Sequence, residues 1–136
     1  MCVFCKIISK EFSSNIVYED DYTLAFLDLS QSNDGHTLVV PKKHVENIFD
    51  MDDETISHVF KTVNKVSKAI SKALNVNNIN IINNNGKTAG QSVFHFHIHI
   101  IPRHENDQIK LEVNDRSKEL NPEDYTIIKD KIKSYL

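Results

Sequence analysis

The chain has 136 residues, of which 40% are hydrophobic and 26% charged, with a formal net charge of −3. This length suits one domain with its own core, and the balance is that of a folded chain rather than a disordered one. The small acidic excess argues against a general nucleic-acid or anionic-membrane binder. No apolar run approaches the roughly 20 residues that span a bilayer, and the N-terminus lacks a signal-peptide pattern. We therefore expect a cytosolic protein whose two cysteines are thiols or metal ligands.

The first half of the chain predicts antiparallel β-structure. Residues 16–20 and 22–28 flank a tight Asp20-Asp21 turn and indicate a hairpin. Residues 36–41 form a β-branched run that a proline ends. Further along, residues 80–84 and 92–102 form another pair of predicted strands, joined by the glycine-containing loop NGKTAG.

Two helices are expected. Between Ile56 and Leu74 apolar residues recur at intervals of three and four, after an acidic start at residues 52–54. Asn121 and Pro122 signal the start of a second helix. Its expected buried face consists of Tyr125, Ile128, Ile132 and Tyr135. In the polar stretch between the helices, the alternation of Ile109, Leu111 and Val113 allows a short edge strand. The element order predicts an α+β domain, an antiparallel sheet with helices on one side.

The most informative segment is QSVFHFHIHIIPR, residues 91–103. His95, His97 and His99 alternate in it with apolar residues. Because side chains two apart in a strand point to the same face, we expect three imidazoles on one face and the apolar residues between them in the core. Clustered imidazoles repel one another when protonated, so such a row weakens a fold unless the protein uses it.

Two chemistries can use this row of histidines. Neutral imidazole binds zinc, copper and iron, and it can also attack phosphorus to form a phosphohistidine intermediate. The neighbouring residues favour the second use for at least part of the row. Candidate cations for an anionic substrate are Lys42, Lys43, Lys87 and Arg103. The loop at residues 84–87 can add backbone N–H donors.

The segment resembles the signature of the histidine triad (HIT) proteins, H-x-H-x-H followed by two apolar residues. CVFCKIISKE, YEDDYTLAFLDLS, GHTLVVPKKH and NNNGKTAGQSVFHFHIHIIPR resemble other parts of that family in the same order, over residues 2–103. The resemblance implies a HIT-like α+β fold with about five antiparallel strands, one long helix and a C-terminal helix. It also implies a single HIT domain over residues 1–136, in which residues 104–136 form an extension that packs on it.

The resemblance implies a hydrolase or transferase that cleaves at the α-phosphate of a purine nucleotide conjugate, either a phosphoramidate or a dinucleoside polyphosphate. In the family the middle histidine, here His97, attacks phosphorus and forms a nucleotidyl-histidine that water then hydrolyses. The carbonyl of His95 would orient its ring, and His99 and His36 would contact phosphate oxygens. No metal is required at phosphorus. Asn84, Gln91 and Ser92 match the family's polar positions around the phosphate and leaving group, and Ser92 could pass a proton to the leaving group.

The resemblance also implies a nucleoside pocket beside the row. Asp28 matches the family's ribose-binding carboxylate, which can accept hydrogen bonds from both ribose hydroxyls. The positions that match the apolar slot for the base are Val3, Phe4, Ile7, Phe26 and Leu29. From the residues alone, these five are equally consistent with plain core, and Asp28 with an ordinary turn.

The pair Cys2 and Cys5 forms C-x-x-C, which by itself is also typical of two buried residues or a redox pair. A structural zinc ion needs four ligands, commonly cysteine and histidine. Some bacterial HIT proteins that resemble this chain bind zinc with such cysteines, the P-x-x-H histidine and the first triad histidine. The resemblance therefore implies a zinc site made of Cys2, Cys5, His44 and His95, which leaves His97 free to react.

Two other functions stay open from the sequence. A cupin-like oxygenase would bind iron or copper with all three triad histidines, although the distant Glu and His ligands of such a site are missing. A non-catalytic zinc- and nucleotide-binding sensor or interaction protein would not require the intact His97 and Ser92. The resemblance further implies a homodimer that pairs a long helix and a strand, and we expect neither nucleic acid nor membrane as a partner.

Overall fold

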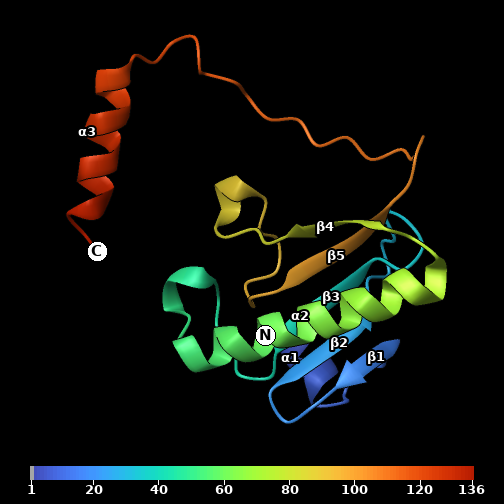
Figure 1. Cartoon of the computed structure of the whole chain (residues 1–136). Helices are drawn as coiled ribbons and strands as arrows, with labels where there is room; N and C mark the ends of the chain where they lie inside the picture. Colours follow the sequence, from blue (N-terminus) through green and yellow to red (C-terminus); the bar gives the residue numbers. More distant parts are fainter. Residues whose placement is uncertain (1) are drawn as a thin grey trace.

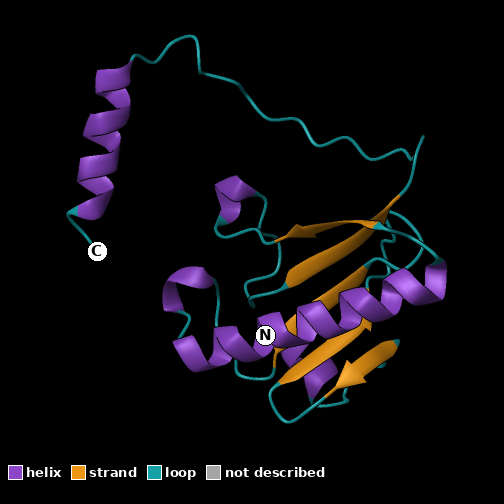
Figure 2. Ribbon diagram, in the orientation of Figure 1, coloured by secondary structure: helices purple, strands orange, loops and turns teal. Residues whose placement is uncertain are grey.

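The computed structural model describes residues 2–136 and contains one five-stranded antiparallel sheet (Figures 1 and 2). Its strands are β1 (Ile16–Glu19), β2 (Thr23–Leu27), β3 (Thr37–Pro41), β4 (Asn78–Ile82) and β5 (Ile98–Arg103). They lie in the order β1-β2-β3-β5-β4, so β5 is a central strand and β4 an open edge. The predicted hairpin is confirmed: the Asp20 carboxylate accepts the backbone N–H groups of Tyr22 and Thr23 and closes the turn between β1 and β2.

One face of the sheet is covered by the long helix α2 (Asp53–Leu74). Asp52 caps its start by accepting the backbone N–H of Thr55, and Asn75 ends it in the left-handed conformation. The apolar stripe predicted from the sequence packs against the sheet and is buried at Val59, Val63, Val66 and Ile70.

The opposite face carries a short helix, α1 (Val3–Ile8), that the sequence analysis did not predict. Phe4 packs there among Leu24, Phe26, Leu38 and Val40. The expectation of helices on one side of the sheet is therefore wrong. Six residues are too few for a helical period to show in the sequence, and the cap is a cysteine, Cys2, whose Sγ accepts the Cys5 N–H.

Two strand boundaries also differ from expectation. The last two sheet strands are Asn78–Ile82 and Ile98–Arg103, instead of residues 80–84 and 92–102. Before β5 the backbone leaves the sheet ladder, because the N–H of Phe96 donates to the carbonyl of Val45 in the loop that precedes α2. His95 and His97 therefore lie in an irregular segment that leads into β5, and only His99 lies in the strand. Two further short elements are 3-10 turns: η1 (Ile48–Asp50) precedes α2, and η2 (Lys87–Ala89) follows β4.

The C-terminal extension ends in α3 (Pro122–Lys133), which stands apart from the sheet (Figure 1). None of residues 110–136 is buried, and residues 109–113 form no strand. The expected helix face of Tyr125, Ile128, Ile132 and Tyr135 is exposed. The predictions of an edge strand, of a buried α3 face and of an extension packed on this domain are thus all corrected. The capping box at Asn121 determines only where α3 begins. Whether the apolar face of α3 is buried depends on which residues pack against it. No helix within residues 2–136 has the length and apolarity to cross a bilayer.

Candidate functional site

The histidine row faces α1, while the alternating apolar side chains are buried beneath α2. The ring of Phe4 lies edge-on to the rings of His95 and His97, with centroids 6.0 and 5.1 Å apart. The His97 and His99 rings are 5.1 Å apart. Phe96 and Ile98 point into the core on the other side. The predicted alternation is therefore confirmed, even though the strand begins only after His97.

The ring of His97 is held with one nitrogen available for reaction. Its Nδ1 lies 2.7 Å from the backbone carbonyl oxygen of His95, and because a carbonyl only accepts, Nδ1 carries the proton. Burial lowers the pKa of His97 more than its hydrogen bond to His95 and the charge of Asp28 raise it. The ring is thus neutral at pH 7, and Nε2 presents a lone pair. The amide of Asn83 holds the segment by donating to the His97 carbonyl at 2.9 Å.

His36 and His99 form a second ordered pair. The backbone N–H of Ser32 donates to Nδ1 of His36 at 3.2 Å, so the proton of the neutral His36 ring is on Nε2. That Nε2 lies 2.9 Å from Nδ1 of His99 and donates to it, which places the His99 proton on its own Nε2. Burial and the neighbouring His97 and His36 lower the pKa of His99 to about 4, so both rings are neutral at pH 7. His99 therefore offers an N–H donor, whose tautomer His36 sets.

Asp28 lies next to the His36–His99 pair and also lines a cavity of about 190 Å³. One carboxylate oxygen is 3.5 Å from Nε2 of His36, and the other accepts the Ser30 N–H. The cavity is lined by all five positions predicted for the base slot, Val3, Phe4, Ile7, Phe26 and Leu29, together with Asp28. Ser13, Ser14, Leu27 and Leu38 complete the wall and were not anticipated. Phe4 thus touches both the cavity and the nucleophile candidate.

The three predicted polar positions occupy different places. Gln91 is buried and engaged with backbone: its oxygen accepts the Gly86 N–H, and its nitrogen donates to the carbonyl of Glu46 at 2.6 Å. It therefore holds the loop before the triad. Asn84 lies against Gly90. Ser92 is exposed and lines a separate open cavity with Cys2 and His44.

Three of the four candidate cations are paired with carboxylates of their own. Lys42 binds Glu19 at 2.9 Å, and Lys43 binds Asp52 at 2.7 Å. Arg103 binds Asp107 at 2.7 Å. Of the ring N–H groups described above, the Nε2–H of His99 is the one that is left to donate to an anion.

Cys2, Cys5, His44 and His95 converge on one point, with one donor atom of each within 4.8 Å of the others. The Sγ–Nδ1 distances are 3.4 Å for Cys2 to His95, 3.3 Å for Cys5 to His44 and 3.6 Å for Cys5 to His95. The two Nδ1 atoms are 3.2 Å apart. A zinc tetrahedron with bonds of about 2.3 Å to sulfur and about 2.0–2.1 Å to nitrogen has S–N edges of about 3.5 Å and N–N edges of about 3.3 Å. The four residues therefore fit zinc in donor type and in spacing.

A hydrogen bond from Nε2 of His95 orients the ring so that Nδ1 can bind a metal ion. Nε2 donates to the carbonyl of Pro41 at 2.8 Å, so in the neutral ring the Nδ1 lone pair faces the thiols. Burial, with smaller effects from His44 and His97, lowers the pKa of His95 and keeps it neutral. Burial and the neighbouring Cys2 raise the pKa of the Cys5 thiol, so deprotonation there calls for a cation.

The geometry argues against a three-histidine metal site. The Nδ1 of His97 is occupied by a backbone carbonyl, His95 faces the cysteines, and His99 faces His36. Within residues 2–136 no metal-binding group contains all three triad histidines. The oxygenase alternative has no support in this arrangement. Sequence reasoning missed Asn83 and Ser32, since nothing local signals a side chain or an amide that acts on a distant histidine.

A family model of the HIT domain matches residues 9–106. The chain belongs to the HIT family. It is 52% identical to the HIT protein of Bacillus subtilis over 103 residues, 76% of this chain and 71% of that one. Crystal structures of HIT family proteins from Bacillus anthracis and B. subtilis superpose with TM-scores of 0.94 and 0.95 at 44% identity, covering 99% of this chain and 96% of theirs. Such scores over 99% of the chain require residues 104–136, α3 included, to superpose too.

Other relatives carry more specific names. An adenosine 5′-monophosphoramidase of Schizosaccharomyces pombe is 36% identical over 98% of this chain and 96% of its own. An adenylylsulfatase of Arabidopsis thaliana is 42% identical over 78% of this chain and 54% of its own. A zinc-bound histidine triad protein of Mycobacterium smegmatis superposes with a TM-score of 0.77 at 35% identity, covering 86% of each chain.

Proposed function

We propose that this HIT protein hydrolyses conjugates of a purine nucleoside monophosphate at the α-phosphorus, through a covalent nucleotidyl group on His97. The observation that carries the proposal is the hydrogen bond from His97 Nδ1 to the His95 carbonyl, which leaves the Nε2 of a neutral ring free, next to Phe4 of the cavity wall. The names of two relatives, a monophosphoramidase and an adenylylsulfatase, support cleavage at a nucleotide α-phosphate. Phosphoramidates are the first substrates to test, and dinucleoside polyphosphates the second.

The reaction proceeds in two balanced steps. The Nε2 lone pair of His97 attacks the α-phosphorus, and the bond to the leaving group breaks as that group takes up a proton. Water then attacks phosphorus on the opposite face, the P–Nε2 bond breaks, and the monophosphate and one proton are released. The Nε2–H of His99 stabilises the charge on the phosphate oxygens in both steps. Donation of the leaving-group proton by Ser92 stays a prediction.

The nucleoside would occupy the cavity between α1 and β2. About 190 Å³ is below the roughly 300–1,000 Å³ of pockets for drug-sized ligands, which suits one ring system with the phosphate outside, over the histidines. Its apolar wall suits a purine base, and Asp28 at its edge suits the paired ribose hydroxyls.

We further propose that one zinc ion binds Cys2, Cys5, His44 and His95, because their spacing fits a tetrahedral ion and a related structure is zinc-bound. The ion would tie α1 to the loop after β3 and to the triad segment. A closed site of four protein ligands is structural, so the ion takes no part in the phosphoryl chemistry. A cytosolic location would keep both cysteines reduced for this purpose.

The direct test is release of adenosine monophosphate from adenosine 5′-phosphoramidate in ¹⁸O-labelled water. We expect turnover with one ¹⁸O atom in the product. We also expect an acid-labile nucleotidylated protein, which mass spectrometry detects after rapid quenching. Turnover without any nucleotidylated protein would contradict the covalent step on His97. No release from either substrate class would leave the non-catalytic sensor as the better description.

The His36–His99 pair makes a separate prediction. His36→Phe keeps an aromatic ring at this position but removes the N–H that donates to His99 Nδ1. The proton of His99 can then move from Nε2 to Nδ1, away from the phosphate. We expect kcat to fall on the order of 100-fold, the lower end of the range for loss of one positioned donor, with KM changed little. His36→Gln, which retains an N–H donor, should recover part of the rate. Equal loss in both variants, or a change confined to KM, would show that His36 does not act through the tautomer of His99.

A further inference from the structure

The loop between β2 and β3, residues 29–35, contacts the ring of His36 at its end. Hydrogen bonds to one side chain give this loop a fixed shape: the Gln31 amide donates to the His36 carbonyl at 2.6 Å, and its oxygen accepts the Gly35 N–H at 2.9 Å. The Ser32 N–H of the same loop donates to Nδ1 of His36 at 3.2 Å. The proton of His36 is therefore held on Nε2 only while the loop keeps its place.

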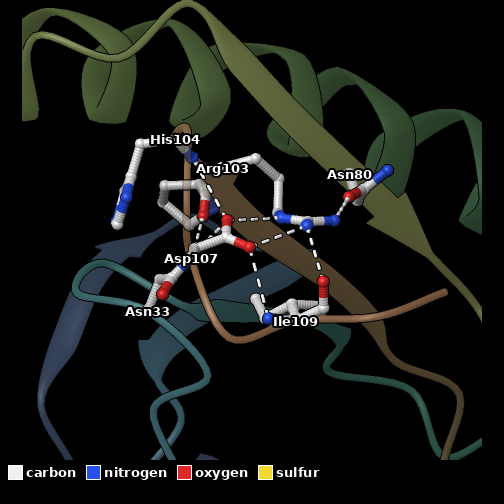
Figure 3. A network of polar contacts seen from close by, with 7 residues as sticks. Asn33, Asn80, Arg103, His104, Asp107 and Ile109 are labelled. Carbon is white, nitrogen blue, oxygen red and sulfur yellow. Dashed lines mark hydrogen bonds and ion pairs between the residues drawn. The ribbon is translucent and has the colours of Figure 1, made fainter.

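The loop is bonded to the rest of the protein through Asn33 (Figure 3). The Asn33 side-chain nitrogen donates to the Pro102 carbonyl at 2.9 Å and to the Asp107 carboxylate at 3.0 Å. Both partners only accept, so they determine the orientation of the amide, and its two protons are both used. In the part of the chain that the structure describes, no other hydrogen bond joins the loop to residues beyond its flanking residues and the two strands that it connects.

Packing brings the loop close to the same end of β5. Gly35 has a φ of +94°, which favours glycine, and a Cβ there would collide with Leu74 and lie 3.3 Å from the Pro102 side chain. This apolar contact holds the loop near the sheet, but hydrophobic contact has no preferred direction. The two hydrogen bonds of Asn33 add the direction, since each requires a donor aimed at its acceptor.

The carboxylate that accepts from Asn33 is itself held by an arginine at the end of β5. The Arg103 guanidinium donates twice to the Asp107 carboxylate, at 2.7 and 2.8 Å, and also to the Asn80 side chain on β4 and to the Ile109 carbonyl. The Asp107 side chain is only 3% exposed. Donation by Arg103 holds the pKa of the Asp107 carboxyl well below its usual range. A charged, bidentate pair of this kind allows little movement of the acceptor.

These contacts lead from one end of β5 to the phosphate site. Asn33 follows Ser32 in the chain, so a shift of Asn33 moves the Ser32 N–H relative to His36. At 3.2 Å that bond is at the long end of the normal range, and a small shift breaks it. His36 in turn donates to Nδ1 of His99, which lies within β5 itself.

We propose that Asn33 and Asp107 are positioning residues, which hold the loop so that Ser32 fixes the tautomer of His36 and thereby the N–H that His99 presents to the phosphate. Without the Ser32 donor, the proton of a neutral His36 ring can occupy either nitrogen. Where it occupies Nδ1, His99 loses its donor and its own proton can leave Nε2. The effect on catalysis rests on the proposed hydrolase function, whereas the tautomers can be measured without any substrate.

The tautomers are tested by ¹⁵N NMR of the full-length protein without nucleotide. Asn33→Asp keeps the size of the side chain but places an oxygen where the nitrogen faces two acceptors. Protonated and unprotonated nitrogens of a neutral imidazole have well-separated ¹⁵N shifts, and His36→Phe identifies the signals of His36. We expect Nε2–H in both His36 and His99 of the wild type, and a mixture of Nε2–H and Nδ1–H in Asn33→Asp. Unchanged tautomers in a folded Asn33→Asp protein would overturn the proposal.

The matched control is Asp34→Asn, the reverse exchange at the next position of the loop. The Asp34 side chain is exposed and makes no hydrogen bond or ion pair within residues 2–136, so both tautomers and the rate should stay as in wild type. Asp107→Asn sets an amide nitrogen against donors and should give the same mixture as Asn33→Asp. Circular dichroism reports whether each variant is folded. Asn33→Ala, which only removes the two donors, replaces Asn33→Asp if the latter does not fold.

Kinetics distinguish positioning of His36 from a general loss of stability. We expect Asn33→Asp to lower kcat on the order of 10-fold, within the roughly 100-fold that a misplacement of about 1 Å can cost, with KM changed little. In a His36→Phe background the same substitution should change kcat by less than about two-fold, because no proton is left to position. A similar loss in both backgrounds, or a change confined to KM, would show that Asn33 does not act through His36. If wild type hydrolyses neither substrate class, the hydrolase proposal fails, while the NMR result still decides whether Asn33 sets the tautomers.

Discussion

Replacing His97 by alanine is expected to abolish nucleotide hydrolysis while leaving the fold and nucleotide binding in place. The nucleophile Nε2 disappears, and no other triad nitrogen substitutes for it, because His95 faces the cysteines and His99 has its proton on the nitrogen that would have to attack. Loss of a nucleophile costs on the order of 10⁴-fold or more in kcat. The measurement is monophosphate release under single-turnover conditions, with binding followed separately by calorimetry.

The matched control for this variant is His58→Ala. His58 lies on α2, where its ring stacks on Tyr22 with centroids 3.6 Å apart, outside the triad and outside the Cys/His cluster. It should retain wild-type turnover. The acid-sensitive nucleotidyl group should be present in wild type and in His58→Ala, and absent in His97→Ala. A His97→Ala protein that still turns over at a rate near wild type would remove the mechanism.

Zinc content and stability should change together in variants of the Cys/His cluster. Protein purified without chelator is expected to hold about one zinc ion per chain, and both Cys5→Ser and His44→Ala to lose it. A ligand at about 1,000 times its dissociation constant stabilises a fold by roughly 4 kcal/mol, which for a chain of this size corresponds to about 10 °C or more in Tm. Elemental analysis and thermal unfolding measure the two effects.

The same His58→Ala protein serves as the histidine control, because it should keep its zinc and its Tm. Wild-type protein without zinc, or a His44→Ala protein that keeps both its metal and its Tm, would contradict the site. The chain links this cluster to catalysis through one residue: the ring of His95 is a ligand candidate, and its carbonyl orients His97. We therefore expect loss of zinc to lower kcat as well, by less than loss of His97 itself.

The central features of the site were predictable from the sequence because they are periodic or local. Alternation in residues 95–100 predicted which side chains enter the core and which form the row, and this holds although β5 begins only at Ile98. The apolar stripe and acidic start of α2 predicted that helix nearly to its ends. The resemblance to HIT proteins supplied what periodicity cannot, namely the set of distant residues that line the cavity and surround the four-ligand cluster.

What the sequence by itself determined is the local conformation and the chemical kind of each residue: the alternating triad, the two capped helices and the C-x-x-C pair. Only the tertiary structure decided which partner each polar atom meets. In the folded chain His36 sets the tautomer of His99, Gln91 donates to the loop backbone, and Asn83 donates to the His97 carbonyl. The tertiary structure also left the predicted face of α3 uncovered. The physical reason is that helix caps and periods act within a few residues, whereas hydrogen-bond partners and burial depend on what the folded chain, or a second chain, places opposite.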